Sequence, residues 1–81
     1  MGGKIITFRE IIELNHILEE KGINAKVHLH DTCGSQSFSV EKDELMPEKD
    51  KEAVRNVIHT YFLNMGFQTR FINDNLEFIL S

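Results

Sequence analysis

One six-residue pattern decides the fold, and it occurs twice: Gly22-Ile23-Asn24-Ala25-Lys26-Val27 and Gly66-Phe67-Gln68-Thr69-Arg70-Phe71. In each copy a glycine is followed by a near-regular alternation of apolar and polar residues. Glycine ends a helix because it adopts the left-handed backbone conformation without strain. Alternation with a period of two is typical of a strand that buries one face. Each copy therefore predicts the end of a helix and the start of a strand.

A helix is predicted before each glycine. Thr7-Phe8-Arg9-Glu10 has the pattern of a capping box, and Pro47 suits the first turn of a second helix because it has no N–H to lose. The first helix is expected over about residues 7–21 and the second over about residues 48–65. Apolar residues at helical spacing predict the buried faces. They are Phe8, Ile11, Leu14 and Leu18 in the first helix, and Val54, Val57, Ile58, Tyr61 and Met65 in the second.

Four strands are predicted by alternation after these helices. Their inward residues are Ala25, Val27 and Leu29, then Phe38 and Val40, then Phe67, Thr69 and Phe71, and finally Leu76, Phe78 and Leu80. The order helix, strand, strand thus occurs twice, over residues 7–41 and 48–80, with an offset of 44 residues between the two glycines. We expect a single domain over residues 1–81, an α+β two-layer sandwich of α-β-β-α-β-β order. Its four-stranded antiparallel sheet has both helices on one face.

The second hairpin is predicted to be short. A two-residue turn at Asn73-Asp74 sets Phe71 opposite Leu76 on the inner face. The same register sets Arg70 opposite Glu77 on the outer face, a favourable cross-strand charge pair.

The first hairpin is predicted to be longer. Leu29 opposite Phe38 sets Lys26 opposite Glu41, a charge pair of the same kind. Lys26 and Glu41 are 15 positions apart, whereas the corresponding pair of the second hairpin is seven apart. Each strand of the first hairpin therefore has about four extra residues, which at roughly 3.3 Å per residue extend about 13 Å beyond the second hairpin.

The projecting part of this hairpin holds the candidate binding residues His28, His30, Asp31, Cys33, Gly34 and Gln36. Loop tips carry function more often than stability. His28 and His30 are two positions apart on a strand, so both imidazoles are expected on the outer face. With the Cys33 thiolate they form a candidate Zn²⁺ site, in which Asp31 is a fourth ligand or an orienting partner. Ordinary surface histidines on a solvated face are the alternative.

Cys33 beside Gly34 is also a candidate nucleophile or redox thiol. Backbone N–H groups of a tight turn stabilise an anion, and a nearby imidazole favours the thiolate. A free thiol without chemistry is the alternative. Gln36 falls near the inner face, where its amide is expected to hold the loop by bonding the backbone.

Composition narrows the classes of function. Nine Lys and Arg against thirteen Asp and Glu give a net charge of −4, and no basic run offers a footprint for nucleic acid. The single cysteine excludes an internal disulfide and is typical of a reducing cytoplasm. The apolar runs are far shorter than the roughly 20 residues that span a bilayer. We therefore expect a cytoplasmic protein with no membrane partner. Nucleic-acid binding through Lys26 and Arg70 is the weakest of the three functions considered.

The segment from His28 to Phe38, His-Leu-His-Asp-Thr-Cys-Gly-Ser-Gln-Ser-Phe, resembles the central motif of the RDAC family of small bacterial proteins. The resemblance covers the chain from Ile5 to Leu80. It implies a bacterial, cytoplasmic protein of a family without assigned activity, and it supplies no catalytic residues. This chain has His30 where the family name has Arg. A role that depends on the arginine charge therefore does not carry over to His30.

The sequence leaves open whether the chain is an enzyme. The function expected first is a non-enzymatic binding or regulatory module that contacts a protein or a small ligand through the outer sheet face and the hairpin over residues 26–41. The alternative is a thiol- or metal-dependent site at the hairpin tip. Because a domain of this size is marginally stable alone, self-association as a homodimer through the open sheet face or an edge is also expected.

Overall fold

Two helices and four strands follow one another in the predicted order. The computed structural model describes residues 5–32 and 35–81, with the side chain of Thr32 excepted. The elements are α1 (Phe8–Glu20), β1 (Ala25–Thr32), β2 (Ser35–Lys42), α2 (Glu48–Leu63), β3 (Thr69–Phe71) and β4 (Phe78–Leu80).

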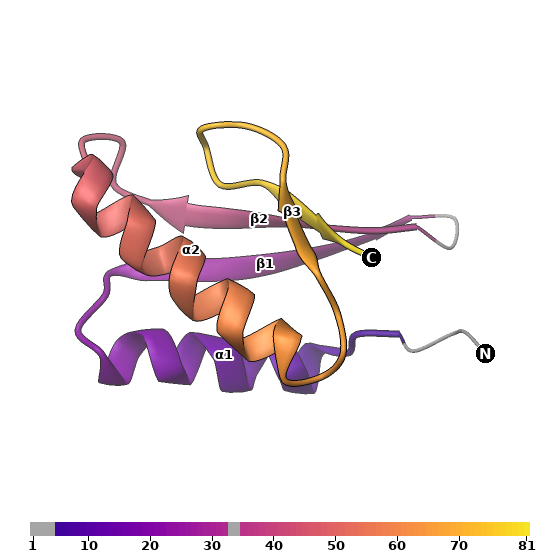
Figure 1. Ribbon diagram of the computed structural model, residues 1–81. Helices are drawn as coiled ribbons and strands as arrows, with labels where there is room; N and C mark the ends of the chain where they lie inside the picture. The colour runs from indigo at the N-terminus through magenta and orange to yellow at the C-terminus, as the bar shows by residue number, and fades with distance from the viewer. Residues whose placement is uncertain (1–4, 33–34) are drawn as a thin grey trace.

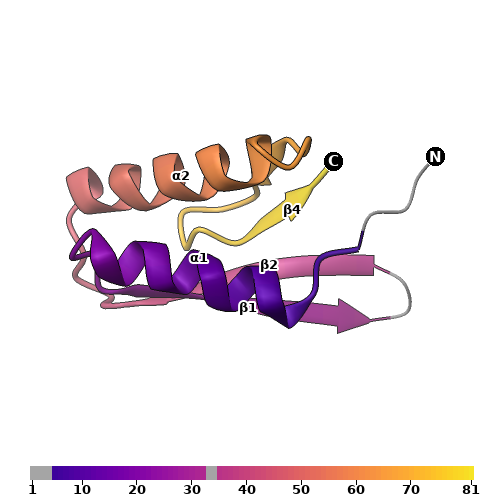
Figure 2. The ribbon, with the colours of Figure 1, turned by 90° about the horizontal axis from the view of Figure 1, so that it is seen from below.

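The four strands form one antiparallel sheet in the order β1-β2-β4-β3. The two hairpins meet at its centre, where Phe38 of β2 lies opposite Phe78 of β4. In Figure 1 the sheet is seen nearly edge-on, with α1 beneath β1 and β2 and with α2 crossing in front. Figure 2 gives the view from below, in which α1 lies in front of the β1–β2 hairpin. The expected α+β sandwich is confirmed.

Both helices begin and end close to the predicted residues. The Thr7 backbone N–H donates to the Glu10 carboxylate at 2.7 Å, which is the Glu10 half of the capping box. The Thr7 hydroxyl also donates to this carboxylate, at 2.6 Å. Gly22 and Gly66 have φ of +74° and +90° beyond the two helix ends, the conformation that glycine adopts without strain. The second helix ends at Leu63, two residues before the predicted Met65.

Two predictions about the helix faces were wrong. Phe8 is 69% exposed, and Ile6, one residue before the cap, is buried instead. Phe62, which the predicted stripe omitted, is fully buried, whereas Tyr61 is only half-buried. The reason is that the axis of α2 centres the buried stripe on Val54, Ile58 and Phe62, at spacings of four.

The core is built around three phenylalanines. The rings of Phe38 and Phe78 stack with centroids 4.8 Å apart, and Phe62 packs against them at 5.8 and 5.9 Å. The sheet and α2 thus meet at one aromatic cluster, which joins the two halves of the chain. The buried apolar residues are Ile6, Ile11, Leu14, Leu18, Ala25, Val27, Phe38, Val40, Val54, Ile58, Phe62, Leu76 and Phe78.

The predicted register of the first hairpin is confirmed. Leu29 pairs with Phe38, and Lys26 pairs with Glu41. Both strands are eight residues long, against three in the second hairpin, so the expected inequality of the two hairpins is present.

The predicted register of the second hairpin was wrong by two residues. Phe71 pairs with Phe78 rather than with Leu76, and Arg70 pairs with Ile79 rather than with Glu77. The strands are joined by residues 72–77, whose backbone is held by the side-chain oxygen of Asn73. That oxygen accepts from the N–H groups of residues 75 and 77, at 3.0 and 3.3 Å.

Leu76 is the physical reason for the longer loop. Its φ of +68° takes it out of the strand, and its side chain is fully buried in the core. Burial of a leucine side chain stabilises a fold by about 1.5–3 kcal/mol, more than the roughly 1–3 kcal/mol that an unfavourable backbone conformation costs.

The two hairpins also point in opposite directions. β2 and β4 are antiparallel, and each begins at the turn of its own hairpin, so the two turns lie at opposite ends of the sheet. In Figure 1 the loop over residues 72–77 rises toward the base of the first hairpin, and the outer part of β1 and β2 extends to the other side. The first hairpin therefore projects beyond the body of the domain rather than beyond the turn of the second hairpin.

Candidate functional site

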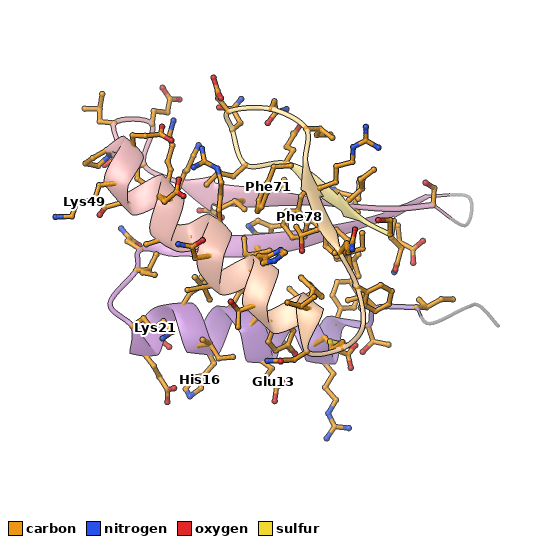
Figure 3. All side chains as sticks on the ribbon, viewed as in Figure 1. Glu13, His16, Lys21, Lys49, Phe71 and Phe78 are labelled. Atoms are coloured by element: carbon orange, nitrogen blue, oxygen red, sulfur yellow. The ribbon has the colours of Figure 1, made fainter. Side chains whose placement is uncertain are left out.

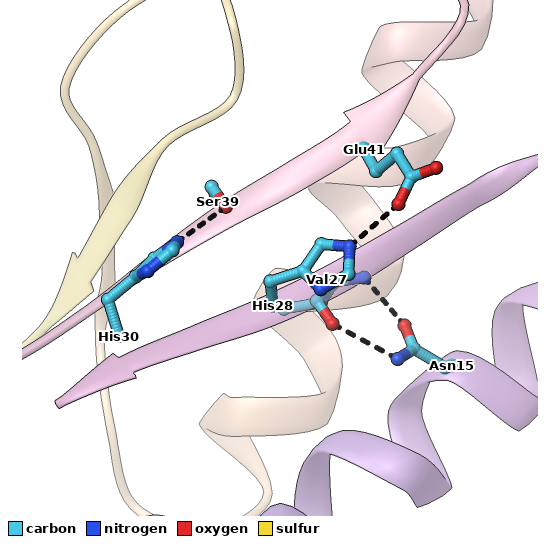
Figure 4. A network of polar contacts seen from close by, with 6 residues as sticks. All are labelled: Asn15, Val27, His28, His30, Ser39 and Glu41. Atoms are coloured by element: carbon cyan, nitrogen blue, oxygen red, sulfur yellow. Dashed lines mark hydrogen bonds and ion pairs between the residues drawn. The ribbon is translucent and has the colours of Figure 1, made fainter.

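The outer face of the first hairpin holds both candidate histidines in defined positions. Residues 25, 27 and 38 of this hairpin are buried on the face that the helices cover. The alternate residues His28 and His30 therefore lie on the opposite face, which neither α1 nor α2 covers. Figure 4 shows their hydrogen bonds. The His28 Nε2 atom lies 2.8 Å from Glu41 Oε1, and the His30 Nε2 atom lies 2.8 Å from Ser39 Oγ.

Both contacts are diagonal across the strand pair. His28 is directly opposite Ser39, and His30 is directly opposite Ser37, yet each ring bonds the residue two positions further along β2. Side chains on neighbouring twisted strands reach such diagonal neighbours readily. The two imidazoles are therefore inclined in the same direction and bonded to different partners.

The charges of this face are exposed. The side chains of His28 and Glu41 are 48% and 72% exposed, and Glu41 bonds His28 rather than Lys26, the residue opposite it. A polar contact this accessible to water, whether neutral or charged, contributes about 0–1 kcal/mol to stability. Its effect is to orient the ring.

Asp31 and Gln36 lie on the other side of the sheet. The Gln36 side chain accepts from the Ile6 N–H at 3.1 Å, and its amide nitrogen donates to the Ile6 carbonyl at 2.8 Å and to Asp31 Oδ2 at 3.3 Å. The expectation that Gln36 bonds the backbone is confirmed, although the bonded backbone is the segment leading into α1. Asp31 was a wrong choice of partner for the histidines, because alternation turns it to the opposite face.

The rest of the expected site is only partly described. Cys33 and Gly34 lie outside the described residues, so the predicted thiol chemistry stays a prediction. Within residues 5–32 and 35–81, no three His, Cys, Asp or Glu side chains are grouped so that they can hold a metal ion. His28 and His30 share a face, and the Zn²⁺ site predicted from them depends on Cys33 for its third ligand.

Asn15 is a residue that the sequence analysis missed. Its side chain accepts from the Val27 N–H at 2.7 Å and donates to the Val27 carbonyl at 3.1 Å (Figure 4), so an amide on α1 pairs with the outer edge of β1. A hollow of about 530 Å³ lies beside it, lined among others by Ile12, His16 and Lys26. A polar residue on the helix flank one turn from Leu18 was the available signal, but the sequence does not say which strand it faces.

Other titratable side chains lie on the helix side. The Tyr61 hydroxyl donates to Glu13 Oε1 at 2.6 Å and so joins α2 to α1. Partial burial, and then this bond to a carboxylate, raise the pKa of Tyr61 well above its usual range. Figure 3 shows Glu13 and His16 extending from α1 away from the sheet, and His16 lies 3.2 Å from Glu20. These groups do not join the histidines of the outer face.

Neither α1 nor α2, the two helices of the described chain, is long and apolar enough to cross a membrane. No protein-family model matches the chain, and comparisons with curated proteins and with solved structures find no significant similarity.

Proposed function

We propose that this chain is a non-enzymatic binding module that recognises another protein through the outer face of its sheet and the hairpin over residues 26–41. The observation that carries the proposal is the pair of imidazoles oriented on a sheet face without a helix. The expected cytoplasmic location and the resemblance to the RDAC family belong to the same proposal.

The shape of this surface favours binding over catalysis. Catalytic sites for small molecules are concave and enclose most of their ligand. The polar side chains of the hairpin's outer face, His28, His30, Ser39 and Glu41, instead stand side by side on a pleated surface and bond one another. A protein partner can approach such a surface over its whole width.

The side chains on the outer face of the sheet suit a mainly polar contact with a protein partner, with some apolar area. Imidazole and hydroxyl groups both donate and accept hydrogen bonds, so these side chains can bond either donors or acceptors on a partner. On the second hairpin Ile79 is half-exposed and directly opposite the exposed Arg70. Protein interfaces combine such apolar and polar groups, and arginine is enriched in them.

Site-specific photo-crosslinking tests the proposal in cells that produce the chain. A photoreactive amino acid at Ser37, on the outer face, is compared with the same group at Lys49, which extends from α2 away from the sheet (Figure 3). We expect a protein adduct from position 37 and none from position 49. The adduct should weaken when His28 and His30 are both replaced by Ala.

Equal adducts from the two positions, or an adduct from position 37 that the double substitution leaves unchanged, would contradict the proposal. Circular dichroism of each variant establishes that the fold is retained. The Zn²⁺ site predicted from His28, His30 and Cys33 is the alternative, and a metal titration separates the two.

A further inference from the structure

Among the described residues, one side chain covers the outer edge of β1, and it does so at Val27. The Asn15 amide bonds both the N–H and the carbonyl of Val27, the two groups through which another strand would pair there. Edge strands present unpaired backbone groups that recruit further strands unless they are covered. Asn15 covers this edge at Val27.

The edge continues beyond Val27, where the described residues provide no such cover. Because backbone groups alternate in direction along a strand, the N–H and carbonyl groups of Leu29 and Asp31 point to the same edge as those of Val27. Among the described residues, no hydrogen bond reaches these four groups from outside β1. The Asp31 carboxylate is turned to Gln36, at 3.3 Å, and so leaves the edge open.

We infer that a second copy of this chain pairs with this edge, β1 against β1 in antiparallel orientation, about a two-fold axis at His30. In this register Leu29 of each copy lies opposite Asp31 of the other. Their backbone groups make four N–H···O bonds, two from each pair of opposed residues. The inference is independent of the function proposed for the outer face.

A second copy fits this edge because the pattern of free groups is complementary to itself. A register centred on Leu29 would require Val27 to pair with Asp31, and Asn15 already occupies Val27. The register centred on His30 is the one in which all free groups of Leu29 and Asp31 in both copies find partners.

The projection of the hairpin makes room for the second copy. β1 and β2 extend beyond the three-residue strands β3 and β4, and Figure 2 shows β1 continuing past the start of α1. Since the paired strands run in opposite directions, the bodies of the two copies lie at opposite ends of the paired segment. The two sheets then join into one of eight strands, with His28 and His30 of both copies on the same outer face.

Crosslinking tests the register directly. In a Cys33→Ser background, His30→Cys places two thiols on opposed residues of a pair without mutual hydrogen bonds. The Cα atoms of such a pair are about 4.5 Å apart, within the span of a disulfide. His28→Cys is the matched control, because its two copies are offset by four residues, roughly 13 Å along the strand. We expect a disulfide-linked dimer from His30→Cys under mild oxidation and none from His28→Cys.

A second pair of variants tests the edge by sedimentation at rising concentration, up to about 1 mM. Asp31→Pro removes an N–H that points away from β2, so the β1–β2 ladder is kept while the dimer loses two of its four hydrogen bonds. Asp31→Ala keeps the N–H and is the control. We expect the wild type and Asp31→Ala to dimerise and Asp31→Pro to remain a monomer with an unchanged circular dichroism spectrum. A monomeric wild type at about 1 mM, dimerisation of Asp31→Pro at wild-type strength, or a crosslink from His28→Cys in place of His30→Cys would each overturn the inference.

Discussion

The two hairpins come from similar stretches of sequence and differ in structure. The first has two eight-residue strands in continuous register, and the second has two three-residue strands and a loop over residues 72–77. Lys26 and Arg70 occupy the same place in the repeated pattern, yet only Lys26 lies opposite a glutamate. Similar alternation therefore does not imply a similar register.

The error in the second register shows why. A shift of two residues leaves every side chain on the same face, since side chains alternate with a period of two. The hydrophobic pattern is thus equally satisfied by Phe71 opposite Leu76 and by Phe71 opposite Phe78. Packing decides between them, because the observed register stacks Phe78 on Phe38 and buries Leu76 from the loop.

The largest expected effect comes from the stacked rings that join the hairpins. Phe78→Ala removes a fully buried ring that contacts Phe38 and Phe62, and should cost about 3–5 kcal/mol. Much of the stability of a small domain is then lost. Urea denaturation should show a lower midpoint or an unfolded chain. Ile72→Ala, at a 55% exposed position next to β3, is the control and should change stability by less than about 0.5 kcal/mol.

Leu76 gives the next effect and tests the loop of the second hairpin. Leu76→Ala should destabilise the protein by about 2–4 kcal/mol, because the leucine is buried although it stands in a loop. Asn75→Ala, one residue earlier and exposed, serves as the comparison and should be nearly neutral. If the two substitutions cost the same in urea denaturation, Leu76 does not anchor the hairpin as described.

Asn15 distinguishes the first hairpin from the second, because it holds the edge of β1. Asn15→Ala leaves the N–H and carbonyl of Val27 without their partner and should cost about 1–2 kcal/mol. Hydrogen exchange should show faster exchange of the Val27 amide. The Phe38 amide, in the sheet interior, is the internal reference and should change less. Unchanged protection at Val27 would contradict the role given to Asn15.

The capping box gives a smaller effect that depends on pH. The hydrogen bond from the Thr7 hydroxyl, followed by that from the Thr7 N–H, lowers the pKa of Glu10 below its ordinary value of 4.5. A carboxyl group with a lowered folded pKa stabilises the protein above its ordinary pKa, and this stabilisation is lost as the pH falls through the folded value. α2 differs from α1, because its N-cap residue is Pro47 and no side chain caps it.

Thermal melts of Glu10→Gln across pH test this difference between the two helices. The wild type should have the higher Tm at pH values above the ordinary pKa of Glu10, and the two curves should converge as the pH falls below it. Glu44→Gln, at an exposed position between β2 and α2, is the control and should follow the wild type. A difference in Tm that stays constant with pH would show that the charge of Glu10 is not responsible.

The smallest effect is expected from Zn²⁺. The two imidazoles of the first hairpin already bond Glu41 and Ser39, and a binding module does not require a metal. With the thiol reduced, an equimolar amount of Zn²⁺ should leave the imidazole NMR signals of His28 and His30 in place. Shifts of both signals that His30→Ala abolishes would favour the metal site with Cys33 instead.

Much of the candidate site was predictable because a strand alternates strictly. The common face of His28 and His30, and the inward position of Gln36, both follow from a period of two. The same rule places Asp31 opposite to the histidines, and grouping it with them disregarded that rule. The partners Glu41 and Ser39 were out of reach, because diagonal contacts depend on the twist of the strand pair.

The sequence by itself determined the order of the elements, the helix ends at Gly22 and Gly66, the faces of the strands and the pairing of β1 with β2. Each of these depends on neighbours in the chain or on a single long alternation. Tertiary structure alone decided that Leu76 is buried in the core and that Phe62, rather than Tyr61, is fully buried. It also decided that the hairpins point in opposite directions and that the Asn15 side chain bonds the Val27 backbone. These features depend on how separate elements fill one core, and periodicity within one element carries no information about that.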